Sequence, residues 1–188
     1  DAVDYSFADV AVSLLTYQAK VNVIRRSDGC SALHYAARNP DSTLYRNLLE
    51  SNADMTVYNQ KGFTPLHEAV KSNHYRFLLL ASNYDSFDTE LDTRFNSSEN
   101  TDGLTLLLLA VYERSLESAE VLIRDLGADI NALDSEDSSA MHYAISAIDV
   151  PMVAMLMKYN PDLLIRDDSG RTPRRLVRHM LMEARQEQ

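Results

Sequence analysis

The feature that most constrains this chain is a short phrase that returns at nearly constant spacing. Its fullest copy is Thr-Pro-Leu-His-Glu-Ala at residues 64–69, two residues after a turn glycine, Gly62. Gly62 tolerates the positive φ that ends a tight turn, because it has no Cβ. Thr64 suits a helix N-cap, and Pro65 suits the first helical position, where its missing N–H costs nothing. The phrase therefore predicts a tight turn that runs directly into a helix.

The same turn position recurs along the whole chain, at Gly29, Gly62, Gly103, Asp137 and Gly170. The steps between these positions are 33, 41, 34 and 33 residues. A period near 33 residues that contains a turn, a helix start and a second helix is typical of a stacked repeat array. We therefore predict an all-α solenoid of helix-turn-helix units with hairpin tips and about five to six repeats.

These motifs resemble the ankyrin repeat family over nearly the whole chain. Residues 64–69 match the first half of its unit, and residues 48–54 and 122–131 match the second half. In this family the histidine of the phrase belongs to a hydrogen-bond network that ties the helix start to the next layer. The resemblance implies this role for His34, His67 and His142. Since these histidines are one or two whole repeats apart, they do not have the spacing of metal ligands.

We predict a single domain over residues 1–188, divided by the repeat period. It begins with a partial unit, followed by four full units and a C-terminal capping unit, with boundaries at 1–25, 26–58, 59–99, 100–133, 134–165 and 166–188. Proline cannot continue a helix, so Pro40 separates two expected helices at residues 32–37 and 43–50. The second helix of the next unit is expected at residues 75–82.

The step of 41 residues predicts an insertion at about residues 84–100. This stretch is acidic and serine-rich, and it carries Phe87, Leu91 and Phe95 at four-residue spacing. One interpretation is a solvated loop that is easily cleaved. The other is a short amphipathic turn that contacts a partner.

Charge is distributed unevenly along the chain. The net charge is −10, and the segment from Ala81 to Ala140 holds 14 acidic and 3 basic side chains, a net charge of −11. Such a segment repels nucleic acid and anionic membranes and attracts basic proteins. The C-terminal unit is instead rich in arginine, which indicates either a solvated cap or a contact with an anion or an acidic partner.

The composition bears on catalysis, cofactors and location. We predict no enzyme and no cofactor, since no acid, base and nucleophile share a recognisable spacing and no phosphate-binding glycine pattern is present. The single cysteine, Cys30, suits a reducing compartment, and no apolar run is long enough to span a membrane. We expect a cytoplasmic location, with a nuclear one as well if the partner is a transcription factor. Because the first residue is Asp1, we expect the chain to be part of a longer protein.

The resemblance implies that turn tips and inner-helix ends line a concave groove that binds proteins. From the variable positions of this unit we predict ten partner-binding residues: Gln60, Lys61, Phe63, Lys71, Asp102, Leu104, Tyr112, Glu113, Glu136 and Ser138. Three of them, Phe63, Leu104 and Tyr112, are expected to be exposed apolar or aromatic anchors with acidic neighbours, as protein interfaces require.

Two functions follow from these features. The first is a non-catalytic interaction domain whose acidic concave surface binds a basic protein. Its enlarged junction before residue 100 is similar to that of the inhibitor-of-κB proteins, which would imply a Rel-type transcription factor as partner. The alternative is an architectural scaffold or spacer within a larger signalling protein, channel or enzyme. The sequence does not identify the partner, the effect of binding or the oligomeric state.

Overall fold

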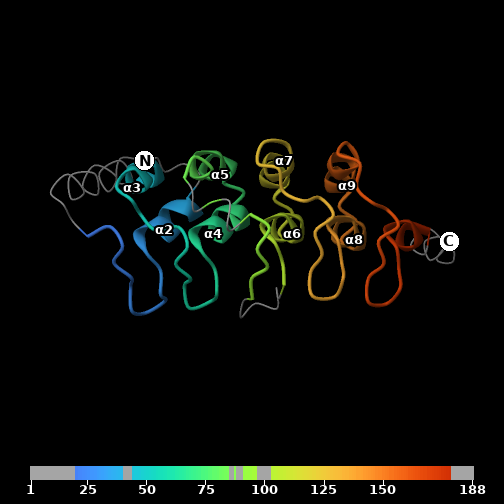
Figure 1. Ribbon diagram of the computed structural model, residues 1–188, viewed down its shortest axis with the longest axis horizontal. Coiled ribbons are helices and arrows are strands. Elements are labelled where there is room, and N and C mark those ends of the chain that lie inside the picture. The colour runs from blue at the N-terminus through green and yellow to red at the C-terminus, as the bar shows by residue number, and fades with distance from the viewer. Residues whose placement is uncertain (1–19, 40–43, 85–86, 88–90, 97–102, 179–188) are drawn as a thin grey trace.

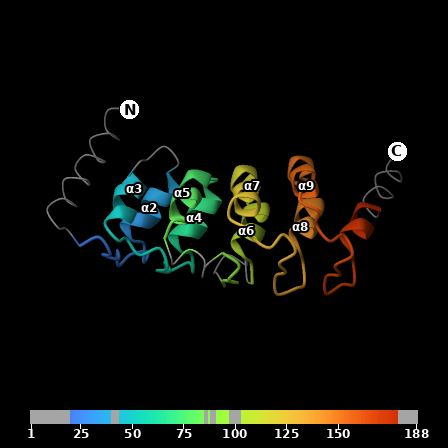
Figure 2. The ribbon, with the colours of Figure 1, turned by 45° about the horizontal axis from the view of Figure 1, so that its top comes forward.

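The computed structural model describes residues 20–39, 44–84, 87, 91–96 and 103–178, and it confirms the predicted all-α repeat fold. Short helices lie in two rows, with long turns projecting from one side (Figure 1). The inner row, next to the turns, contains α2 (Ala32–Arg38), α4 (Pro65–Lys71), α6 (Leu106–Tyr112) and α8 (Ala140–Ser146). The outer row contains α3 (Leu44–Glu50), α5 (Tyr75–Ala81), α7 (Leu116–Arg124) and α9 (Val150–Met157). Both rows persist when the molecule is turned (Figure 2).

Of the two terminal units predicted from the sequence, the structure describes the C-terminal one more fully than the N-terminal one. A helical segment at residues 173–178 follows the last long turn, as expected for the capping unit. The partial unit predicted at residues 1–25 falls mostly on residues 1–19, which lie outside the described residues. The helices predicted at 32–37, 43–50 and 75–82 are present, with ends that differ by one residue.

Each inner helix begins at a hydroxyl residue with extended backbone. The N-caps of α2, α4, α6 and α8 are Ser31, Thr64, Thr105 and Ser139. In α2, α4 and α8 the backbone N–H of the cap donates to Nδ1 of the histidine three residues later, at 3.1 Å in each case. These bonds satisfy backbone donors that would otherwise be orphaned at a helix start. The repeated Ser/Thr-x-x-His pattern therefore fixes where three of the inner helices begin.

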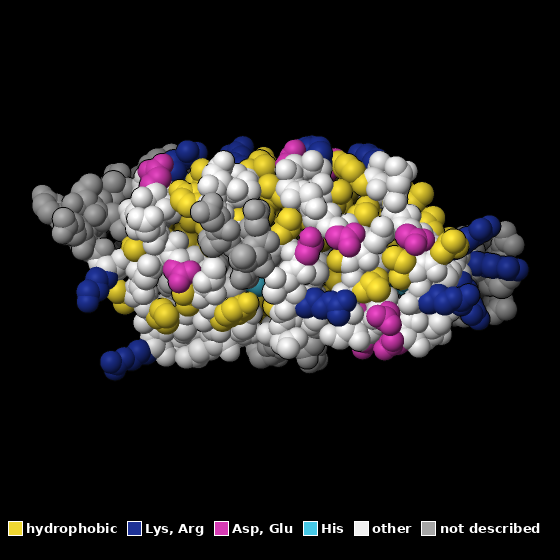
Figure 3. All heavy atoms as spheres, in the orientation of Figure 1, with side chains coloured by type: hydrophobic (Ala, Val, Ile, Leu, Met, Phe, Trp, Pro, Cys, Tyr) yellow, Lys and Arg dark blue, Asp and Glu magenta, His cyan; other side chains and the backbone are white. Residues whose placement is uncertain are grey.

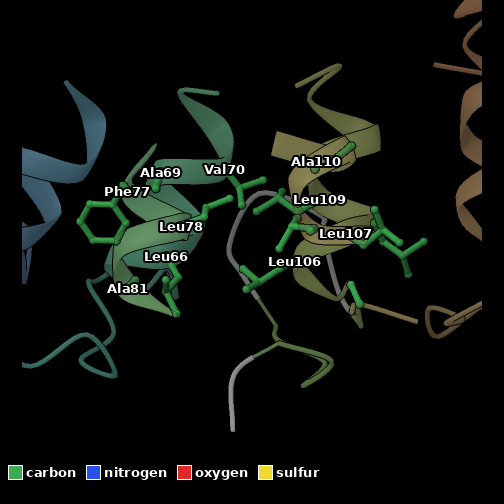
Figure 4. Close-up of a cluster of buried hydrophobic side chains, with 14 of the residues drawn as sticks. Leu66, Ala69, Val70, Phe77, Leu78, Ala81, Leu106, Leu107, Leu109 and Ala110 are labelled. Atoms are coloured by element: carbon green, nitrogen blue, oxygen red, sulfur yellow. The ribbon is translucent and has the colours of Figure 1, made fainter. Parts of the chain in front are cut away.

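The core consists of apolar side chains held between successive layers. Val70 of α4 and Leu109 of α6 point toward each other across the space between the two inner helices (Figure 4). Both are fully buried, as are Leu66, Leu106 and Ala110. An inner helix is thus covered by a neighbour on each side, which is why its sequence is almost wholly apolar.

The long turns stack on one another. The backbone N–H of Gln60 donates to the carbonyl of Asp28 at 2.9 Å, and Asp168 bonds in the same way to Glu136 at 3.0 Å. Gly103 lies so close to the next turn that a Cβ on it would be 2.8 Å from the backbone nitrogen of Ser135. In these three pairs, neighbouring turns are therefore in close contact.

The apolar residues of the insertion are part of the core, so both interpretations of them were wrong. Phe87 and Phe95 are 1% and 3% exposed, and Leu91 is half-buried against the same core. They follow an amphipathic pattern because they pack on this chain rather than on a partner. The other residues of the insertion, at 85–86, 88–90 and 97–100, lie outside the described residues.

The insertion also widens one turn. In three turns a backbone N–H donates across four residues, from Asn59 to Phe63, Asp134 to Ser138 and Asp167 to Arg171. The equivalent bond in the fourth unit runs from Phe95 to Leu104, at 3.0 Å. A phenylalanine thus occupies the position that holds Asn or Asp in those three turns, and the sequence between it and Leu104 is longer than in them.

Candidate protein-interaction surface

The side of the array that carries the turns presents several of the predicted partner-binding residues. We call it the turn face, and we define it by the turn tips and the C-terminal ends of the inner helices: residues 27–28, 60–61, 135–136 and 168–169 with Arg38, Lys71, Tyr112 and Ser146. Grooves lie between successive units on this face. These grooves are where side chains from different repeats meet.

The first groove has a volume of about 450 Å³ and lies between the units of α2 and α4. Arg38 Nη2 donates to Glu68 Oε1 at 2.5 Å, and Asn59 Nδ2 donates to the same oxygen at 2.9 Å. Glu68 is 6% exposed, so its charge is compensated within the groove. The bond to this carboxylate raises the pKa of Arg38. Gln60, a predicted site residue, also lines this groove.

The wall of this groove contains two further predicted residues, Lys71 and Phe63. The Lys71 ammonium lies 4.1 Å from the centroid of the Phe63 ring, and its Nζ lies 3.6 Å from Glu113 Oε1. A cation over an aromatic face is attracted by the ring quadrupole. The predicted Lys61 is exposed on the turn above. Four of the predicted residues therefore line one groove: Gln60, Lys61, Phe63 and Lys71.

Two of the predicted anchors are not exposed. Phe63 is 0% and Leu104 is 1% exposed, so the expectation that they offer free apolar surface was wrong. The Phe63 ring packs 5.8 Å from that of Phe95 and is covered by Lys71. Leu104 is held at the base of the widened hairpin. The position after the turn glycine is thus buried at Phe63 and Leu104, whereas Arg171, at the same position of the last turn, is exposed.

The third predicted anchor, Tyr112, is 50% exposed at the end of α6. Its ring meets that of Tyr143 edge-on, with centroids 6.2 Å apart. The Tyr143 hydroxyl donates to the carboxylate of Asp134, which is buried, and burial raises the pKa of Tyr143. Tyr112 thus rests on a tyrosine that is itself fixed, with the predicted Glu113 beside it.

A second groove, of about 130 Å³, lies between the unit of α8 and the C-terminal unit. The predicted residues Glu136 and Ser138 line it, together with Tyr143, Ser146 and Arg171. Glu136, Ser138, Ser146 and Arg171 occupy the positions that line the first groove, three repeats further along the chain. Asp102, the remaining predicted residue, lies outside the described residues.

The acidic segment does not face one direction. Glu113, Glu136 and Asp137 lie on the turn face, whereas Glu117 and Glu120 belong to α7 in the outer row. Figure 3 shows one view of the surface, in which Lys and Arg gather at the C-terminal end. The turn face is therefore less uniformly acidic than the count along the sequence implied.

The pair of Arg38 and Glu68 was absent from the predicted set. The two residues are 30 positions apart and meet only because adjacent units stack. A signal existed at residue 68, where a carboxylate stands within an otherwise apolar inner helix. Its partner could not be read from that signal.

No three His, Cys, Asp or Glu side chains in the described part of the chain converge as a metal site requires. No described helix is both long and apolar enough to cross a membrane.

Comparison with known proteins shows which family and which proteins this chain is similar to. A family model for ankyrin repeats (3 copies) matches residues 1–90 and 77–167. Neurogenic locus notch homolog protein 1 of Danio rerio is 34% identical over 167 residues, covering 88% of this chain and 6% of that protein. Its counterpart in Xenopus tropicalis is 36% identical over 146 residues, covering 77% of this chain and 5% of that protein.

A further relative, neurogenic locus notch homolog protein 2 of Homo sapiens, is 31% identical over 169 residues, covering 89% of this chain and 6% of that protein. The chain thus spans a small part of the length of these relatives. They are notch homologues, so they give no support to the narrower resemblance to the inhibitor-of-κB proteins. With the stacked two-helix units and the match over most of its length, this chain belongs to the ankyrin repeat family.

Proposed function

We propose that the turn face binds a protein partner through Tyr112 and the acidic residues near it, as a non-catalytic interaction domain within a larger signalling protein. The observation that carries this proposal is the half-exposed ring of Tyr112, fixed against Tyr143 and adjacent to Glu113. Tyrosines of this kind dominate binding energy in protein interfaces, because they bury much area at little entropic cost.

Charge favours a basic partner for this part of the face. Glu113, Glu136 and Asp137 lie at the inner-helix end and the turn tip, and the net charge of the chain is −10. Such a surface speeds the encounter with basic proteins and repels nucleic acid. That the partner is a transcription factor, and that the chain acts in the cytoplasm or nucleus, are parts of the proposal that rest on the sequence alone.

An architectural role is the second candidate. The chain covers 5–6% of its notch relatives, which is compatible with a spacer inside a long protein. A pure spacer needs no exposed aromatic on one face, so the exposure of Tyr112 favours the binding role.

The proposal is tested by affinity capture from cytosolic extract, followed by mass spectrometry. The chain is compared with a variant carrying Glu113→Lys and Glu136→Lys. The matched control carries Glu117→Lys and Glu120→Lys on the outer helix α7, with the same change of charge. We expect the first variant to lose the basic proteins captured by the parent and the control to retain them.

Equal losses in both variants would mean that capture depends on net charge rather than on the turn face, and retention in both would contradict the proposal. For any captured partner, the association rate should fall as salt rises, since charge steers the encounter. Circular dichroism of both variants verifies that the fold is kept.

A further inference from the structure

We infer that the partner of the turn face is of mixed charge and places an acidic side chain in the first groove, between Arg38 and Lys71. This inference rests on the proposed function, because it concerns the same face. The proposed function predicts a basic partner. The present inference predicts a partner that has acidic residues at one end of its binding segment and basic residues at the other.

The walls of the first groove carry more positive than negative charge. Arg38, Lys61 and Lys71 line it, together with only two carboxylates. Both carboxylates are engaged within the chain, as are Arg38, which pairs with Glu68, and Lys71, which lies 3.6 Å from Glu113 Oε1. Glu68 is 6% exposed and accepts from Arg38 and Asn59, while Asp28 accepts from the hydroxyl of Tyr35 at 2.5 Å and the backbone N–H of Cys30 at 3.1 Å. The groove is therefore a better receptor for an anion than for a cation.

Two of these cations are held in place by their neighbours. Arg38 is fixed by its bond to the buried Glu68, and its side chain remains 36% exposed. Lys71 is fixed over the ring of Phe63, and its side chain remains 22% exposed. Groups that are already ordered lose little freedom when a ligand binds, so they bind it more tightly.

The second groove has the same position in its own unit but not the same charge. Ser146 stands where the first groove has Arg38, and Glu136 stands at the turn position of Asp28. Arg171 also lines the second groove but is paired with Asp167 at 2.8 Å, so the lining of this groove carries a net negative charge. The two grooves lie on one face, three repeats apart. A single partner crossing both would meet opposite charge at its two ends.

The net charge of the described residues also changes from positive to negative along the chain. The described residues of 20–84 hold eight Lys and Arg and four Asp and Glu, a net charge of +4. The described residues of 91–165 hold four Lys and Arg and eleven Asp and Glu, a net charge of −7. Complementary potentials of this kind set the direction in which a partner docks.

The test is an NMR titration of the ¹⁵N-labelled chain at low salt with two probes, acetylated and amidated hexaglutamate and hexalysine. We expect hexaglutamate to shift the backbone amides of Cys30, Gln60 and Phe63. We expect hexalysine to shift those of Glu113 and Glu136. Lys61→Gln with Lys71→Gln should abolish the hexaglutamate shifts and leave the hexalysine shifts in place.

The matched control is Glu136→Gln with Asp137→Asn. It should weaken the hexalysine shifts and leave the hexaglutamate shifts in place. The inference is overturned if hexaglutamate shifts only the amides of the C-terminal arginines, or shifts no amides of the parent chain. It is also overturned if the hexaglutamate shifts are unchanged in the variant carrying Lys61→Gln and Lys71→Gln. If that occurs while capture still depends on Glu113 and Glu136, the proposed function stands and only the mixed-charge partner is excluded. Loss of that capture dependence would instead remove the proposed function.

Discussion

The ring of Phe95 lies against the imidazole of His67, with centroids 3.9 Å apart and planes inclined by 62°. In the neighbouring units, Nε2 of His34 bonds to the carbonyl of Phe63, and Nε2 of His142 bonds to that of Arg171, both at 3.0 Å. The carbonyl in the equivalent position for His67 is that of Leu104. It accepts the backbone N–H of Phe95, as the carbonyls of Phe63 and Arg171 accept those of Asn59 and Asp167, but Nε2 of His67 does not bond to it. Among the described residues, the buried Nε2 of His67 has no hydrogen-bond partner.

The insertion has therefore replaced one bond between layers with an aromatic contact. The role that family resemblance implied for the three histidines holds in full for His34 and His142, and only at Nδ1 for His67. An unpaired buried polar atom costs about 1–3 kcal/mol. The contact with Phe95 and the burial of both rings offset this cost.

The first prediction concerns pH. Burial lowers the pKa of His67 from 6.5 to about 3. Between these values the unfolded state binds a proton that the folded state does not, so stability rises with pH. The contribution is complete above pH 6.5 and is lost as pH falls from 6.5 toward 3, by on the order of a few kcal/mol. Urea denaturation at a series of pH values measures it.

A natural control for this prediction exists in the next unit, where Leu108 occupies the position of His67. His67→Leu should flatten the dependence of stability on pH between 4 and 6.5. Some slope should remain, because burial also lowers the pKa of His34. An unchanged slope in this variant would show that His67 titrates normally.

The second prediction concerns the insertion. Phe95→Ala should reduce the free energy of unfolding by about 3–5 kcal/mol, since it removes a buried ring from the core. Phe95→Leu should cost less, because it leaves most of the volume filled. Denaturant unfolding of both variants measures the difference. A loss below about 1 kcal/mol for the alanine variant would indicate a solvated position.

The third prediction concerns the stacking of turns. Gly103 has φ +77°, and a Cβ on it would meet the backbone of Ser135. Gly170 has φ +70°, with nothing within 4 Å of such a Cβ. Gly170→Ala should therefore cost only the left-handed conformation, about 1–2 kcal/mol. Gly103→Ala should cost more, because the neighbouring turn must also move. Equal changes in Tm would contradict the close approach.

The fourth prediction concerns the helix start of α4. Thr64→Ala combined with Pro65→Ala should destabilise the chain, the lost cap alone costing roughly 0.5–2 kcal/mol. The matched change in the C-terminal unit, Thr172→Ala with Pro173→Ala, should cost less, because Thr172 is only half-buried. Thermal unfolding followed by circular dichroism compares the two. Identical Tm values for the first variant and the parent would contradict the capping role.

Much of the architecture could be read from the sequence because each unit is specified locally. A turn glycine, a capping Ser or Thr and a run of apolar residues lie within ten positions of one another, and all are present at residues 62–71. The same locality explains the exposure of Tyr112, which lies at a helix end. The prediction of exposure failed at Phe63 and Leu104, whose environment is made by other units.

The period and local chemistry of the sequence by themselves determined the stacked helical units, their starts and the surface that the turns present. Only the tertiary structure decided that the ring of Phe95 would lie against His67, whose Nε2 has no bond to the carbonyl of Leu104, and that Arg38 would reach Glu68. Both outcomes depend on how closely successive layers approach. Such distances arise from packing between residues about thirty positions apart, and no local pattern encodes them.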